Sequence, residues 1–171
     1  MSRNDIQPKE TGGRNSLPHD RWGVATGTNP TIKAGEPIKQ NTMSTGLAHQ
    51  VILLVDGDLT VGTDAGFAGI ASIDSTETAS ATGYVDAYVP LPDIKWEIKA
   101  KSSAAADTQS EIDAFLGGLY AIDLTSSVFT MDTAGGTAQA NAFLIVGGDP
   151  NRSTVHFRVR PDACSFGRAS V

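Results

Sequence analysis

The sequence predicts a mainly β protein with one short helix and an extended N-terminal arm. Gly, Ala, Ser and Thr are abundant while only 6% of residues are aromatic, a composition that favours short strands and turns. Several segments beyond residue 30 alternate between apolar and polar side chains, and turn signals separate them. Only one segment carries the start and stop signals of a helix. This pattern of about eight or nine strands suits a small β-barrel or sandwich-like body.

The predicted arm comprises residues 1–30, and residues 31–171 form the predicted β-barrel-like domain. The arm is rich in Pro and Gly and shows no strand or helix period. Alone, such a segment cannot bury enough apolar surface to offset the entropy lost on ordering. It is a disordered tail, an arm that orders on a neighbouring subunit, or a segment that folds back onto its own domain. Trp22, beside Arg21, favours an anchor that fills a pocket.

The strands of the body follow from alternation and from apolar runs. In the segment from Ile94 to Ala100, one face is apolar (Ile94, Trp96, Ile98) and the other is charged, which indicates a strand with one buried face. The run 48–55 is apolar throughout, so we expect a strand buried on both faces. Beginning with the first segment of the body, the predicted strands cover 31–39, 48–55, 67–73, 83–89, 94–100, 119–124, 127–131, 141–146 and 153–160.

A short helix is predicted at about residues 109–117. Thr108 and Glu111 have the spacing of a capping box, in which both side chains satisfy free N–H groups of the first turn. Ile112, Phe115 and Leu116 then fall on one helical face. The pair Gly117-Gly118 supplies the stop, because glycine accepts the left-handed conformation of many helix ends.

Charge is distributed unevenly along a chain of net charge -6. Between Gln40 and Ile94 there are seven acidic residues and no Lys or Arg, whereas four Arg and one Asp follow Pro150. An acidic chain repels a phosphate backbone, so we expect no nucleic-acid partner. The two oppositely charged regions either mate between copies, select an acidic partner, or remain solvated faces.

The residues do not indicate an enzyme, a metal site or a cofactor. The three His and the single Cys164 lack a partner at metal-ligand spacing. The sequence Asp56-Gly57-Asp58 begins like a calcium loop, but Val61 stands where glycine is required. No nucleophile elbow or phosphate-binding loop occurs. No apolar run is long enough to span a membrane, and the N-terminus lacks the apolar part of a signal peptide.

The order of several segments resembles head decoration (cement) proteins of tailed phages. An arm leads into TIKAGEPIK (31–39), followed by FAGIA (67–71) and GYVDAYVPLP (83–92), and the chain ends with FLIVGGDPNR and VHFRVRP (143–161). In that family a segment like GEP…FxGIA forms barrel strands of a small β-tulip-like body. The likeness covers residues 31–160.

This resemblance implies a structural role on the outer surface of a virion, for a protein made in the host cytoplasm. Its expected partners are the major capsid protein and further copies of itself, as a homotrimer. A ligand that binds only the mature lattice stabilises that lattice. Two regions are the expected contacts: the arm, with Arg14, Leu17, Arg21 and Trp22, and the strand face of His156, Arg158 and Arg160. If the strand face does not contact a partner, it is a solvent-exposed face of the barrel.

Three other functions stay open from the sequence. The chain is a different virion part, such as a connector or fibre-base module, if it forms rings. It is a carbohydrate-binding β-domain if Tyr84 and Tyr88 form an exposed platform. It is a small hydrolase if titratable groups meet in a pocket.

Overall fold

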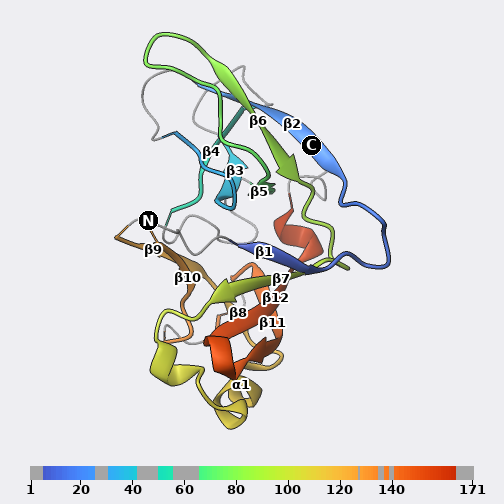
Figure 1. Ribbon diagram of the computed structural model, residues 1–171, viewed down its shortest axis with the longest axis vertical. Helices are drawn as coiled ribbons and strands as arrows, with labels where there is room; N and C mark the ends of the chain where they lie inside the picture. Colours follow the sequence, from blue (N-terminus) through green and yellow to red (C-terminus); the bar gives the residue numbers. More distant parts are fainter. Residues whose placement is uncertain are drawn as a thin grey trace.

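The chain forms two strand assemblies, a barrel and a sheet, that follow one another along its long axis (Figure 1). This computed structural model describes residues 6–25, 31–41, 50–55, 66–126, 128–134, 137–138 and 141–164. The predicted class is confirmed, because the molecule is mainly β with one short α-helix and a closed barrel.

The barrel closes on itself in the strand order β2-β4-β3-β5-β6. Strands β2 and β4 are parallel, and every other neighbouring pair is antiparallel, including the β2–β6 pair that completes the circle. Its interior is narrow and is filled by one tryptophan with small and branched aliphatic side chains. The barrel strands are β2 (His19–Val24), β3 (Pro37–Gln40), β4 (Gln50–Leu53), β5 (Phe67–Ala71) and β6 (Gly83–Tyr88).

The sheet has five antiparallel strands in the order β1-β7-β12-β11-β8. A separate two-stranded hairpin, β9–β10, lies beside it and is linked through a bridge between Ala100 and Met131. The strands are β1 (Gln7–Glu10), β7 (Lys95–Lys99), β8 (Leu119–Tyr120), β9 (Ile122–Thr125), β10 (Val128–Met131), β11 (Phe143–Asp149) and β12 (Thr154–Val159).

One face of the sheet packs against the barrel. Phe67 of β5 meets Phe143 of β11 edge to face, with ring centroids 5.3 Å apart, and Phe143 meets Phe157 of β12 at the same separation. Trp96 and Ile98 of β7 belong to the same buried cluster. Because barrel and sheet share this apolar cluster, burial of apolar area holds the two assemblies together.

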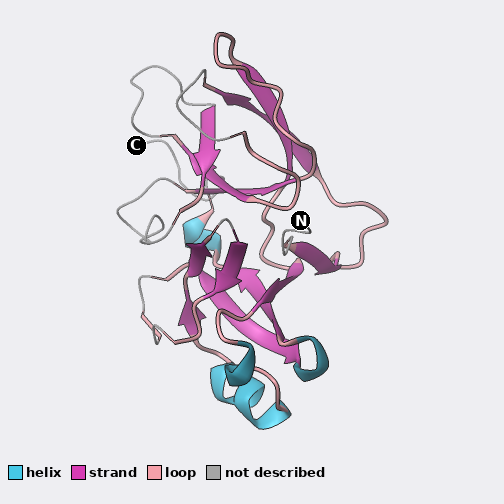
Figure 2. Cartoon of the chain, turned by 60° about the vertical axis from the view of Figure 1, so that its left-hand side comes forward, coloured by secondary structure: helices cyan, strands magenta, loops and turns pink. Residues whose placement is uncertain are grey.

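The helix α1 (Gln109–Phe115) forms where its capping signals predict it. Thr108 and Glu111 make the complete capping box, and Gly117 has a φ of +76° just beyond the helix end. Ile112 is buried against Gly148, but Leu116 is not on the packed face. The helix ends at Phe115, two residues before its predicted end, so Leu116 has an extended backbone and is 47% exposed. Figures 1 and 2 show α1 at the end of the sheet far from the barrel.

Most strands of the body lie close to their predicted positions. Only the end of the predicted 31–39 strand forms one, as β3, and the predicted 119–124 strand is divided between β8 and β9. β6 has Val85 and Ala87 inside the barrel and Tyr84 exposed, as its alternation predicts. The β11–β12 hairpin turns through η2 (Pro150–Arg152), a single turn of 3₁₀-helix. In β4, however, only Val51 is fully buried, because the strand covers one side of a narrow barrel. Residues 48–49 of that predicted strand lie outside the described residues.

The N-terminal segment differs most from its prediction. Residues 6–25 do not leave the body: β1 forms the edge of the sheet beside β7, and β2 closes the barrel between β4 and β6. Of the three interpretations, folding back onto the same domain describes these residues. The division at residue 30 therefore does not match the structure, because pairing with strands far along the chain orders a segment that lacks a core of its own.

Candidate interaction surface

The outer face of the sheet gathers charged side chains because three strands alternate in register. In β7 the side chains of Trp96 and Ile98 enter the core, which leaves Lys95, Glu97 and Lys99 on the opposite face. In β12 the same alternation leaves His156 and Arg158 outside. Glu97 lies directly between its two cross-strand partners, His156 of β12 and Gln7 of β1.

Glu97 is the centre of this face and is only 6% exposed. Its Oε2 accepts a hydrogen bond from Lys9 Nζ at 3.0 Å and lies 3.2 Å from His156 Nε2. Its Oε1 lies 2.7 Å from Arg152 Nη1 of the hairpin turn. Burial favours the protonated acid, but the hydrogen bonds from Lys9 and His156 and the charge of Arg152 outweigh it. The pKa of Glu97 therefore lies below its usual range.

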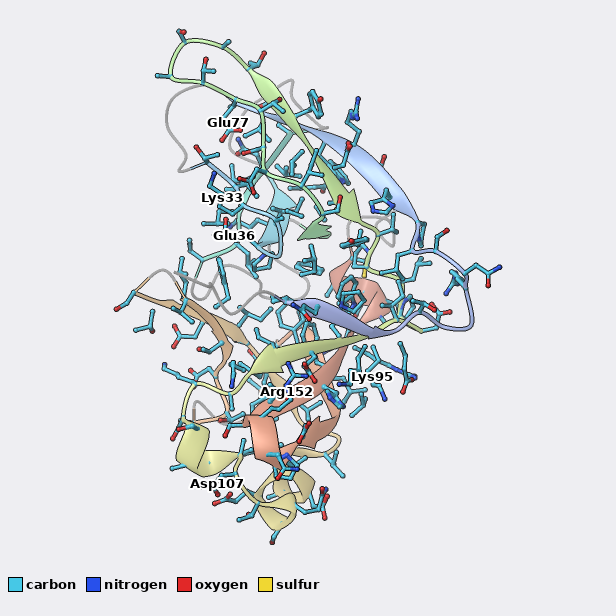
Figure 3. All side chains as sticks on the ribbon, in the orientation of Figure 1. Lys33, Glu36, Glu77, Lys95, Asp107 and Arg152 are labelled. Atoms are coloured by element: carbon cyan, nitrogen blue, oxygen red, sulfur yellow. The ribbon has the colours of Figure 1, made fainter. Side chains whose placement is uncertain are left out.

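The remaining charges give this surface an excess of positive charge. Lys95 pairs with Glu10, whereas Lys99 donates to the backbone oxygen of Arg152 at 2.6 Å. Arg158 is exposed and makes no hydrogen bond or ion pair with the residues that the structure describes. Five Lys or Arg side chains face two Glu, which leaves three net positive charges on a chain of net charge -6. We call this set the basic face: Lys9, Glu10, Lys95, Glu97, Lys99, Arg152, His156 and Arg158 (Figure 3 labels Lys95 and Arg152).

Arg158 lies near the acidic groups at the β1 edge of the basic face. The hydrogen bond from Lys95 lowers the pKa of Glu10, and the charges of Arg158 and His156 act in the same direction. Arg160, expected on the same stripe, is not part of it. Strand β12 ends at Val159, and the Arg160 guanidinium turns to Asp162, with Nε 3.0 Å from Oδ1.

The four contact residues expected in the arm have partners within the chain. Trp22 and Leu17 are buried in the two apolar clusters, so they stabilise this chain's own fold and are not available to fill a pocket on a neighbouring subunit. Arg14 pairs with Asp93. Arg21 makes a two-pronged pair with Asp86, at 2.7 and 2.9 Å, and its side chain is 63% exposed.

Three of the four described acids in the acidic middle of the sequence, all but Glu77, form ion pairs with cations that precede them. Besides the Arg14 and Arg21 pairs, Lys33 Nζ lies 2.9 Å from Asp74 Oδ2. Three acids between residues 66 and 93 are thus paired with the N-terminal part of the chain. Asp56, Asp58 and Asp64 lie outside the described residues. The acidic region is therefore a weaker docking surface than its sequence suggests, since each paired carboxylate already has a counter-charge.

The two tyrosines of the expected sugar platform already have neighbours. The Arg21 guanidinium carbon lies 4.2 Å from the centroid of the Tyr84 ring. The Tyr88 ring is half-buried and tilted against His19 and Trp96, with centroids 4.6 and 6.1 Å apart. Stacking on a sugar needs an open ring face, so this arrangement does not favour a carbohydrate site.

The single cysteine, Cys164, is buried. Burial raises the pKa of the Cys164 thiol to about 11, and Asp162 adds to that shift, so the thiol stays protonated and unreactive near neutral pH. Within the described ranges, no group of three His, Cys, Asp or Glu side chains is arranged to hold a metal ion. Across that part of the chain, no helix has the length and apolar character needed to cross a membrane.

The sequence alone pointed to only part of the basic face. The alternation of residues 153–160 placed His156 and Arg158 on a polar strand face. Lys9, Glu97 and Arg152 come from three separate segments, so no single pattern in the sequence brings them together. The charged face of 94–100 was visible, and pairing it with the 153–160 strand would have placed Glu97 opposite His156. Lys9 carried no such signal, because β1 has no apolar alternation of its own.

No protein-family model matches this sequence, and a search of curated proteins finds no similar chain. What the protein does is therefore inferred from its fold and its surface.

Proposed function

We propose that this protein is a structural component of a tailed-phage virion that binds the outer capsid surface and stabilises the lattice of the major capsid protein. It acts as an oligomer, with a homotrimer as the expected form. Its partners are capsid subunits and further copies of itself.

The observation that carries this proposal is the place of the family-like segments in the barrel. The Gly35-Glu36-Pro37 sequence leads directly into β3, and FAGIA is β5. These two strands are antiparallel neighbours, with Pro37 opposite Ile70 and Ile38 opposite Gly69. The resemblance implied barrel strands for these segments, and their pairing supports the comparison with decoration proteins.

The structure changes which surfaces suit a capsid contact. Trp22 and Leu17 are core residues, so the N-terminal segment cannot act as a clamp without opening the barrel. Of the expected contact residues, the exposed ones are Arg14, Arg21 and Arg158. Contact through such surface side chains suits a protein that is added to a finished shell, because its own fold is complete beforehand.

The first test is sedimentation of the source lysate on a density gradient, with the chain quantified in each fraction. Many copies on capsid-sized particles are expected. A chain that stays in the soluble fractions would remove the virion role. A few copies at one vertex would instead indicate a connector or fibre-base module.

A second measurement tests stabilisation. Particles stripped of this chain are heated with increasing concentrations of the purified protein, and release of the genome is followed with a dye. Because the ligand binds the intact lattice, the temperature of disruption should rise with the logarithm of the free protein concentration. No rise despite demonstrated binding would limit the chain to a passive surface role.

A further inference from the structure

The end of the molecule that carries α1 is acidic. Residues 102–151 include six Asp or Glu and no Lys or Arg, although Lys101 forms ion pairs with two of these acids, Asp123 and Asp132. Asp107, Glu111 and Asp113 cluster on α1 and the residue before its cap, with Asp107 and Asp113 exposed. Glu111 raises the pKa of Asp107 through a shared hydrogen bond, so these two carboxyl groups are close together. We call Asp107, Glu111, Asp113 and Leu116 the α1 tip (Figure 3 labels Asp107).

An exposed apolar side chain accompanies the acids of the α1 tip. Leu116 is 47% exposed, more than any other large apolar side chain among the described residues. The basic face has an apolar counterpart. Leu144 of β11 points away from the core, lies opposite Arg158 in the strand register, and is half-exposed. Each surface thus combines charges of mainly one sign with an apolar contact.

We infer that the α1 tip of one copy docks on the basic face of a second copy. The tip carries three acidic side chains, two of which share a hydrogen bond, and the basic face has three net positive charges. The approach of the two surfaces is therefore favoured by charge, which also fixes their orientation. Among the described residues, Arg158 acts on Glu10 and Asp93 only through its charge, without a hydrogen bond or ion pair, and Lys99 donates to a backbone oxygen. A carboxylate of the second copy would give Arg158 and Lys99 an ion-pair partner.

The occupant is a second copy rather than nucleic acid or an unrelated protein, because both complementary surfaces belong to this chain. A net charge of -6 opposes approach to a polyanion. This contact would build the oligomer on which the proposed function relies, and in that sense it rests on that function. Its measurement uses the purified chain alone, so the two can fail separately.

The test is sedimentation velocity of the full-length protein at concentrations up to about 100 μM, where a weak contact is populated. Self-association is expected at low salt and should weaken roughly tenfold or more at high salt, because exposed charges are screened. Arg158→Glu should weaken the association about tenfold or more. Lys39→Glu, the same charge change on β3 of the barrel, is the matched control and should have little effect.

Exchange of charge between the two surfaces makes the test specific. One variant carries Arg158→Glu with Lys99→Glu, and the other carries Asp107→Lys with Asp113→Lys, which leaves the capping box intact. Each variant alone should remain monomeric, because its two surfaces then share one sign. An equal mixture should associate, because each reversed surface meets its complement.

Three outcomes would overturn the inference. They are a monomeric wild type at every concentration, association of both variants as strong as that of the wild type, and a mixture that fails to associate although both variants keep the wild-type circular dichroism and melting temperature. If the protein associates as expected but is absent from particles, the proposed function is wrong and the inferred contact between copies is still supported.

Discussion

Trp22 is the one aromatic side chain of the described barrel interior, and it is 4% exposed. All its buried neighbours in that cluster are aliphatic, and six of the eight are alanines or valines, which are much smaller than the indole. A small barrel of this kind depends on one large side chain to fill the space that the others leave.

Trp22→Ala is therefore expected to destabilise the protein by about 3 to 5 kcal/mol, through lost burial and the cavity left behind. Urea unfolding followed by far-ultraviolet circular dichroism measures the loss. Arg21→Ala, on the outer face of the same strand, is the control and should cost far less. Equal losses for the two variants would mean that Trp22 is not the centre of the barrel.

Glu97 makes the stability depend on pH in a defined direction. Its folded-state pKa is lowered, so the ionised form stabilises the native state above the pKa of the unfolded chain, and this contribution is lost as pH falls through the folded value. Glu97→Gln should cost about 2 kcal/mol at neutral pH, since charged hydrogen bonds are lost. The difference from wild type should shrink below about pH 4.

Urea unfolding at a series of pH values measures this difference. Glu10→Gln makes the same chemical change at an exposed site on the same face and should have a much smaller effect. A Glu97→Gln loss that stayed constant with pH would assign it to packing rather than to charge.

At the scale of an element, Gly69 shows why β5 takes its particular sequence. Its φ is +145°, a region that favours glycine, and an added Cβ would lie 2.2 Å from the backbone oxygen of Tyr88. The glycine in FAGIA thus allows β5 to approach β6 closely enough for the barrel to close.

Gly69→Ala should destabilise the protein by roughly 2 to 5 kcal/mol, because backbone strain adds to a steric overlap. Gly13→Ala separates these effects: its φ is +79°, but nothing lies within 4 Å of the added Cβ, so only about 1 kcal/mol is expected. Thermal unfolding of both variants compares them. A smaller loss at Gly69 than at Gly13 would contradict the close approach.

Elements with local signals were predictable, and those with distant partners were not. The capping box fixed α1, and Pro150 with its neighbours fixed the hairpin turn, because each depends on residues a few positions apart. β1 and β2 pair with β7 and β6, far along the chain. Trp22 and Val24 do alternate, but a strand of six residues between Pro/Gly-rich stretches gave too little pattern to decide.

The same distinction applies to the basic face. Its strand residues follow from alternation, whereas its central contacts join β1, β7 and the hairpin turn, and only tertiary pairing brings those together. For the whole molecule, the barrel was predictable from strand number and turn spacing. The role of the N-terminal segment was not, because its stability comes from its partners rather than from its own composition.

At the scale of the whole molecule, deletion of residues 1–25 should abolish cooperative folding. It removes one strand from a closed five-stranded barrel and the edge strand of the sheet, together with Trp22 and Leu17. Near-ultraviolet circular dichroism should lose its fine structure, and a hydrophobic dye should bind. An independent arm would instead leave a truncated chain with native spectra and a sharp unfolding transition.

The path of the N-terminal segment has a consequence for synthesis. β1 and β2 leave the ribosome before β6 and β7 are translated. Until residues 83–99 have emerged, β1 has no strand to pair with, and β2 has only its short parallel pairing with β4. In that interval their unpaired edges are open to any chain that already presents the matching strands. Where many copies are made from one message, the nearest such chain is an older copy of the same protein. Exchange of the N-terminal strands between successive copies is then the main hazard of production, and slower translation would increase it.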